Sequence, residues 1–587
     1  MATTSPQQDD EFSFATTIMA NLSCETMARS CDVLEGVIYP VYQDALYADD
    51  TTWILTASFV ILTMQSGFGL LEIGVSSPGN EVNVMLKNVC DILFGSLAFY
   101  LFGYGIAYGD PSNGFMGLGD FAPTENFDDP VSSGIQYAQY LFQLSFAATS
   151  TTIVSGGIAM RMKFKVYCLF AFWAVIVYCF PAHWVWSETG WLGRLGVHDF
   201  AGGGPVHLLG GFNAFVAIKF VGPRKGRFDG SRPESDFVES SPTGQLFGLL
   251  ILWFAWIGFN CGSSFGITEE KWLVATRTGV ATMNAAAGGG IMGLIYSQWA
   301  TSRTYVRPFD IVNGVLGGLV SSSPTCACVQ TYEALIIGAI GSLLACCSNE
   351  QLFKNKMKID DPVGAVGAHA SAAIWGILAV GLFSDSRFEG VEVADGLFKG
   401  GGWTQLGLQL LEVVAVIAWS CAAMIPFFYL VGVLVSNDWK NPRKGLVLHF
   451  PEFKDKPHQA DPRIHDCMED NINVEDVLGK IKEAFYDEIR DDVLQSLKEY
   501  LENEDRHNLK SHPEEEETEH WTPADSHGGE SLDQVQQATS KVNLPRRSLE
   551  RRPSAINALK TLFRKEGGLL GIPFKARQNS GERNSSK

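Results

Sequence analysis

The stretch DFAGGGPVHLLGG, residues 199–211, places a histidine inside a run of small and apolar residues. A second stretch, DPVGAVGAHASAAIWG at residues 361–376, repeats this pattern late in the chain. In each stretch an aspartate precedes the histidine by eight residues, and small residues follow the histidine three and four positions later. We therefore interpret the two stretches, which contain His207 and His369, as equivalent parts of an internal repeat.

The histidine stretches lie within a succession of apolar runs that extends from about Thr51 to Val435. Each run is near the ~20 residues that cross the hydrocarbon core of a bilayer as a helix. We expect about eleven membrane helices, over residues 51–75, 83–108, 133–160, 165–186, 199–222, 243–266, 273–297, 308–325, 331–349, 362–383 and 403–435. His207 falls in the fifth and His369 in the tenth. The chain is therefore predicted to be an all-α polytopic membrane protein with a five-plus-five inverted repeat and a final helix. Substrate sites in such folds lie near the midplane between the repeats.

The loops between the predicted helices alternate in charge. Basic loops follow the third, fifth, seventh and ninth helices, with the sequences RMKFK, GPRKGRF, TSRTYVR and FKNKMK. Basic loops are typical of the cytoplasmic side, so we expect an extracellular segment over residues 1–50, a transmembrane domain over 51–436 and a cytoplasmic tail over 437–587. Asn21, in the triplet Asn-Leu-Ser, is a candidate glycosylation site on the outer segment. The formal net charge of −20 argues against nucleic acid as a partner.

His207 and His369 are the candidate functional residues of the predicted bilayer interior. An ionisable side chain there is costly and usually faces a cavity or a pathway. A single histidine is better explained as a packing residue, but two at equivalent repeat positions favour a shared pathway. Imidazole suits a pathway because it donates and accepts hydrogen bonds near neutral pH. Asp199 can cap its helix, and a second role in stabilising a nearby cation stays open. Asp361 is expected to act as a helix cap.

Aromatic residues gather toward the predicted outer half of the membrane, in AHWVWSETGW (182–191), LFQLSF (141–146) and WFAWIGFNCGSS (253–264). Phe142 and Phe146 are one helical turn apart and share a face. Aromatic faces attract cations, so this vestibule favours a small cation with N–H donors, although each aromatic taken singly also fits a packing or interface role. The apolar path beyond disfavours a bare charge. We expect the cation to be bound outside, to lose its proton and to pass as a neutral species.

Together with the motifs MQSGFGLLEIG (64–74), GPRKGRFD (222–229) and WIGFNCGSS (256–264), the histidine stretches resemble the ammonium transporter (Amt/Mep/Rh) family, in the family's order. The resemblance is to the Amt branch, in the eukaryotic form with a long cytoplasmic tail, and it covers about residues 50–437. It implies a homotrimer in the plasma membrane with a pore in each subunit. It implies ammonium or ammonia as the substrate, with methylammonium as an analogue, electrogenic transport in which NH3 and a proton move separately, and no cofactor.

The resemblance also implies roles for individual residues. These are recruitment of ammonium by Trp186, Ser263, Phe142, Gln143 and Asp199, gating by Phe146 and Phe259, and a pore lined by His207 and His369. Gly204 stands where the family usually has a small β-branched or polar residue, and Pro205 where it often has an aliphatic one. Pro205 removes a backbone donor and is expected to bend the helix. Trp184 is a rival for the position of Trp186. Glu72 is expected to cap a helix end or to lie at an interface.

The tail carries two further patterns. Apolar residues at spacings of three and four predict an amphipathic helix over 473–502. Ser548 and Ser554 follow paired arginines and are candidate phosphorylation sites, so kinases or other cytoplasmic regulators are candidate partners. Two alternatives to transport stay open, an ammonium sensor that signals through this tail and a neutral NH3 channel of the Rh type. An enzyme is disfavoured, since the chain lacks H-E-x-x-H and two histidines make a poor zinc site.

Overall fold

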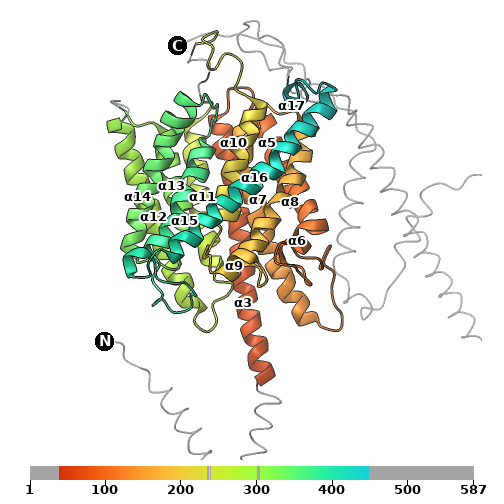
Figure 1. Cartoon of the computed structure of the whole chain (residues 1–587), viewed down its shortest axis with the longest axis vertical. Helices are drawn as coiled ribbons and strands as arrows, with labels where there is room; N and C mark the ends of the chain where they lie inside the picture. Colours follow the sequence, from red (N-terminus) through yellow and green to blue (C-terminus); the bar gives the residue numbers. More distant parts are fainter. Residues whose placement is uncertain (1–38, 234–236, 238, 301–304, 449–587) are drawn as a thin grey trace, which may run out of the picture. The chain divides into compact units, whose positions relative to one another are not determined.

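The computed structural model describes residues 39–233, 237, 239–300 and 305–448, and these residues form a bundle of helices (Figure 1). Apart from helices, the described residues contain two isolated β-bridges, Ser112 with Gly117 and Met162 with Val447. The predicted all-α class is confirmed. Asn21, the predicted 473–502 helix, Ser548 and Ser554 lie outside the described residues.

The helices of the first half of the chain are α3 (Tyr39–Leu62), α4 (Met64–Val75), α5 (Glu81–Ala98), η2 (Phe99–Gly103), α6 (Tyr104–Tyr108), α7 (Pro130–Ile158), α8 (Phe164–Trp186), α9 (Trp191–Leu195), η3 (Gly203–Leu208) and α10 (Leu209–Val221). Those of the second half are α11 (Pro242–Gly262), α12 (Lys271–Ile295), η5 (Tyr296–Ala300), α13 (Pro308–Ser322), α14 (Thr331–Cys347), η6 (Ser348–Lys356), η7 (Val366–Ser371), α15 (Ala372–Phe383), η8 (Leu397–Lys399), α16 (Thr404–Ser436) and α17 (Arg443–Leu446).

Each predicted membrane helix coincides with a helix of the structure, and the differences lie at the ends. The first begins at Tyr39 and is interrupted at Thr63, between α3 and α4. The fifth and tenth begin later than predicted, at Gly203 and Val366. The residues before these two positions form capping turns, which a hydrophobicity pattern does not separate from helix.

Eight helical segments in the described residues are long and apolar enough to cross a membrane. The three other predicted spans correspond to α7, α12 and α13. From Phe142 to Ile158 every residue of α7 is buried, and so is most of α13. A helix that contacts other helices in place of lipid can carry serine, threonine and glycine, which lowers its hydropathy without preventing it from spanning.

Glycines let the two halves of the chain approach closely. A Cβ atom on Gly248 of α11 would lie 2.6 Å from the backbone nitrogen of Leu71 in α4. A Cβ atom on Gly74 of α4 would lie 2.6 Å from the backbone nitrogen of Gln245 in α11. Since real Cβ atoms do not come this close, the first helices of the two halves can pack in this way only with glycine at these positions.

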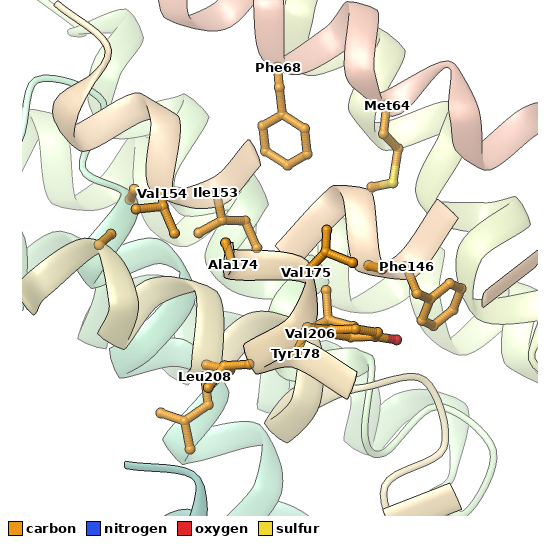
Figure 2. Close-up of a cluster of buried hydrophobic side chains, with 14 of the residues drawn as sticks. Met64, Phe68, Phe146, Ile153, Val154, Ala174, Val175, Tyr178, Val206 and Leu208 are labelled. Atoms are coloured by element: carbon orange, nitrogen blue, oxygen red, sulfur yellow. The ribbon is translucent and has the colours of Figure 1, made fainter. Parts of the chain in front are cut away.

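The largest apolar core of the described residues extends through much of the bundle, and it includes side chains of α4, α7, α8 and the helix that carries His207. Figure 2 shows Met64 and Phe68 of α4 pointing toward side chains of α7, among them Phe146 and Ile153. This core holds α7 in place, and α7 in turn carries Phe146, one of the two aromatic residues of the predicted gate.

Two of the basic loops are tied together by a buried acidic residue. Arg161 Nη1 lies 2.9 Å from Asp360 Oδ2, and Arg224 Nη2 lies 2.8 Å from Asp360 Oδ1. Burial would raise the pKa of Asp360, but the hydrogen bonds and charges of Arg224 and Arg161 outweigh it and lower this pKa to about 2. The ion pairs of these arginines with Asp360 therefore hold the ends of α7, α10 and η7 together. This is a structural role besides the effect of basic loops on membrane orientation.

Candidate functional site

The two repeat histidines meet at the centre of the bundle. The rings of His207 in η3 and His369 in η7 are 5.5 Å apart, centroid to centroid, with 31° between their planes. Both side chains are buried. The indole of Trp256 in α11 stacks on His207 at 4.8 Å and lies 6.4 Å from His369. The two histidines, which are 162 positions apart in the sequence, thus form a pair beside one tryptophan.

Each histidine is positioned by the same local device. Both lie on a π-helical turn that follows a glycine with positive φ, Gly202 at 85° and Gly364 at 78°. Asp361 accepts hydrogen bonds from the backbone N–H groups of Gly364 and Val366, at 3.0 and 2.8 Å. A carboxylate that accepts the unpaired N–H groups at a helix start holds the first turn in one geometry. The capping role expected for Asp361 is confirmed.

Asp199 makes the equivalent cap in the first half. Its Oδ1 atom accepts from the N–H groups of Gly202 and Gly203 at 2.9 and 2.7 Å, and its Oδ2 atom accepts from that of Gly204 at 2.6 Å. The next residue, Pro205, has no N–H group and stands in the first turn, where helices leave donors without partners. Pro205 therefore removes a donor that the turn does not use. The chain stays helical past Pro205, since α10 follows η3 directly, and the bend expected at Pro205 stays a prediction.

One ring nitrogen of His207 has a partner. His207 Nε2 lies 3.3 Å from Ser323 Oγ, which accepts the indole N–H of Trp256 at 3.0 Å. The hydroxyl proton of Ser323 is thereby directed away from the indole, and it can be donated to the imidazole or to the carbonyl of Leu319, which is also 3.3 Å away. The Nδ1 atoms of His207 and His369 have no hydrogen-bond partner in the described residues. Two buried imidazole nitrogens are thus available to a small polar molecule.

A pair of phenyl rings lies next to the histidines. Phe146 of α7 and Phe259 of α11 stack at 3.8 Å with 10° between their planes. The ring of Phe259 is 5.6 Å from that of His207. Both phenylalanines are fully buried. The stack therefore places two buried phenyl rings directly beside the imidazole of His207.

The residues expected to recruit a cation surround the other side of the stack. Phe142 lies 4.8 Å from Phe146, and Trp186 meets Phe146 edge to face at 5.9 Å. The indole N–H of Trp186 donates to the backbone carbonyl of Asp199 at 2.8 Å. Trp186 is therefore held by the same turn that caps η3.

The two polar candidates lie on the helices that carry the stack. Gln143 of α7 is buried, and its Oε1 atom has no hydrogen-bond partner in the described residues. Ser263 follows α11 and donates to the carbonyl of Phe259 at 3.0 Å, which leaves its oxygen able to accept. Both groups can accept a hydrogen bond from a cation with N–H donors.

Trp184, the rival of Trp186, faces elsewhere. Its ring packs 5.3 Å from Phe115 and 5.5 Å from Trp419, and its N–H donates to the carbonyl of Phe115. The structure thus brings Trp186, and not Trp184, to the phenyl stack.

Glu72 joins three helices. It accepts hydrogen bonds from Ser155 of α7 and from Asn88 of α5, the second at 2.8 Å. Of the two roles expected for Glu72, the structure places it at an interface between helices.

Three residues of the site were not among the individual residues that the sequence predicted. Trp256 stood inside a quoted motif but was not singled out, and Ser323 carried no signal within its run of serines. Glu412 of α16 is a buried acidic residue in an apolar segment, and this contrast with its neighbours could have marked it.

Comparisons with known proteins bear on the family and the fold of the chain. Residues 52–439 match the model of the Ammonium Transporter Family. The chain is 39% identical over 422 residues to putative ammonium transporter 3 of Caenorhabditis elegans, which covers 70% of this chain and 60% of that protein. The chain therefore spans less than two thirds of that relative.

Among solved structures, the fold resembles a protein described as a sensor Amt protein, with a TM-score of 0.61 and 30% identity over 69% of this chain and 96% of that one. It also resembles Mep2 of Candida albicans, with a TM-score of 0.60 and 27% identity over 68% of this chain and 86% of that one.

Proposed function

The chain belongs to the ammonium transporter family, and we propose that it moves ammonium across a membrane by separating it into NH3 and a proton. One observation carries the proposal. The stacked rings of Phe146 and Phe259 adjoin the buried pair His207 and His369, which come from opposite halves of the chain. This order of groups matches what a small N–H cation requires, namely attraction, exclusion of water and a polar path through an apolar interior.

Recruitment falls to the groups beside the stack. The faces of Trp186 and Phe142 attract a cation, and the oxygens of Gln143 and Ser263 accept its N–H bonds. The carboxylate of Asp199 contributes negative charge nearby, although its oxygens are engaged by backbone N–H groups. The bound species is thus an ammonium ion that has lost part of its water shell.

Passage beyond the stack requires loss of the charge. A bare cation in an apolar interior costs many kcal/mol, whereas neutral NH3 costs far less. We propose that NH3 passes between the rings of Phe146 and Phe259, and that a proton passes separately by way of His207 and His369. Because both products cross, the net movement is one positive charge for each ammonium ion.

The assembly and its setting are also proposed. We propose a homotrimer in the plasma membrane, as the resemblance implies. The proposed orientation, with the N-terminal segment outside and the tail in the cytoplasm, accords with the basic loops that include Arg161 and Arg224. No cofactor enters the proposal.

The test is electrical. Full-length protein is expressed in a voltage-clamped cell, and the current evoked by ammonium or methylammonium is measured for the wild type and for His207→Ala, each normalised to protein at the cell surface. A saturable inward current is expected in the wild type. In the variant it should fall on the order of 100-fold or change its ion selectivity, as expected for loss of a proton-handling group.

The alternatives give other results. Uptake of methylammonium without current would overturn charge movement and indicate neutral conduction of the Rh type. Surface protein with neither current nor uptake would favour the ammonium sensor, and one of the similar structures is a protein described as a sensor Amt protein.

A further inference from the structure

A polar stripe on α16 leads to the cap of the His207 helix. Gln405, Gln409 and Glu412 lie four and three positions apart, on one face of the helix, and all three are buried. Gln405 donates to Gln409 Oε1 at 3.0 Å, and Gln409 donates to Glu412 Oε2 at 3.3 Å and to the carbonyl of His198 at 2.8 Å. One oxygen of Glu412 is therefore held by an amide donor.

The other oxygen of Glu412 faces a second carboxyl group. Glu412 Oε1 has no hydrogen-bond donor among the described residues. It lies against the Cα of Gly204, so that a Cβ atom on Gly204 would collide with it. The same Cβ position is 3.3 Å from Asp199 Oδ2. The carboxyl groups of Glu412 and Asp199 thus both lie against Gly204.

The two carboxyl groups are not equivalent. Asp199 already accepts three backbone N–H groups, which suits an ionised carboxylate. Glu412 Oε1 faces an acceptor and no donor. Two ionised carboxylates in contact and away from water repel strongly, whereas a proton between them replaces repulsion by a hydrogen bond.

No cation of the described residues relieves this repulsion. Asp199 is the group whose charge acts on Glu412. The other titratable groups on which the charge of Asp199 acts are Tyr178 of α8 and the thiols of Cys326 and Cys328 after α13. His207 of η3, which packs on α16, lies in the turn that Asp199 caps. His198 precedes Asp199 and contacts Gln409 through its backbone. A phenol and thiols are neutral near pH 7, so they supply no positive charge.

We propose that Glu412 is a proton-holding partner of Asp199, and that the pair carries one proton, held on Glu412 and donated to Asp199. The pair then presents one negative charge, and Asp199 keeps the position in which it caps η3. Glu412 is a positioning residue that acts through Asp199. Its part in transport rests on the proposed function, whereas its protonation does not.

Protonation is tested by infrared spectroscopy on the full chain in lipid vesicles. At neutral pH the spectrum of the wild type minus that of Glu412→Gln should contain the carbonyl band of a protonated carboxylic acid, and Asp199→Asn should shift this band. Glu72→Gln is the matched control, because Glu72 is an equally buried glutamate bonded to Ser155 and Asn88. Its substitution should leave the Glu412 band in place. Absence of that band from the wild type would overturn the proposal.

The positioning role is tested by the ammonium current per surface protein. Glutamine has the shape and charge of a protonated glutamate, so Glu412→Gln should keep KM within about twofold, whereas Glu412→Ala should raise KM several-fold or more. A purely structural role would lower the amount of surface protein and leave KM unchanged in both variants. An equal loss in Glu412→Gln and Glu412→Ala would mean that Glu412 is ionised. If the infrared band is present but the wild-type protein does not transport ammonium, the proposed function is wrong. The proposal that Asp199 and Glu412 share a proton would then still hold.

Discussion

The phenyl rings of Phe146 and Phe259 stack at 3.8 Å, in direct sequence with the imidazole of His207, which lies 5.6 Å from Phe259. The stack joins α7 of one half of the chain to α11 of the other. Phe142 and Trp186 contact Phe146, and His207 contacts Phe259. In the proposed function, a species that moves from the recruiting residues to the imidazoles has to part these rings.

We expect Phe259→Ala to lower the selectivity of the current for ammonium over potassium. Removal of one ring leaves a space that water can enter, and a hydrated ion then no longer has to lose its shell. The measurement is the reversal potential in mixed ammonium and potassium solutions. Phe428→Ala is the matched control, since Phe428 is equally buried and stacks on Phe170 at 5.9 Å in the core. A selectivity change of equal size in both variants would contradict a role specific to the gate.

Trp186→Leu should raise the KM for ammonium with a smaller effect on the maximal current. Loss of one aromatic face is expected to weaken cation binding by about 1 kcal/mol, or roughly fivefold in affinity. Trp184→Leu serves as the control, because the ring of Trp184 packs on Phe115 and Trp419. Equal KM values for the two variants would argue against recruitment by Trp186.

Gly204→Ser should destabilise the protein by about 1–3 kcal/mol, as overpacking of a core does. The cause is the collision of the new Cβ atom with Glu412 Oε1. Glu412→Ala removes this obstacle, so the double variant should regain much of the loss in thermal unfolding of the detergent-solubilised protein. Additive losses in the double variant would show that the two residues do not share this space.

Asp360→Asn should lower the stability at neutral pH by about 3–5 kcal/mol, because Arg161 would be left buried without its counter-charge. The folded pKa of Asp360 is about 2, below the value of about 3.9 for an unfolded aspartate. The stabilisation is therefore present above about pH 4 and is lost as the pH falls toward 2. Melting temperatures across this range should fall more steeply in the wild type than in the variant. Parallel curves would contradict the assignment.

The fold was predictable to the extent that it depends on local patterns. Apolar runs of membrane length located the helices, and the repeated spacing of aspartate and histidine located the two turns that hold His207 and His369. The ends were harder, because a cap such as Asp199 belongs to the same apolar stretch as the helix that follows it. The candidate site was predicted in part by the resemblance, and the roles of its residues stay predictions.

The sequence by itself determined the helices and the pairing of each histidine with a capping aspartate, because these depend on residues close to one another in the chain. It also determined the repeat, because the same local spacing occurs twice. Only the tertiary structure decided that Trp186 and not Trp184 adjoins Phe146. It alone brought Ser323 to His207, 116 residues away along the chain, and Glu412 to Asp199. Such contacts depend on how helices pack across the bundle, and packing is set by the fit of many side chains together, which no local periodicity encodes.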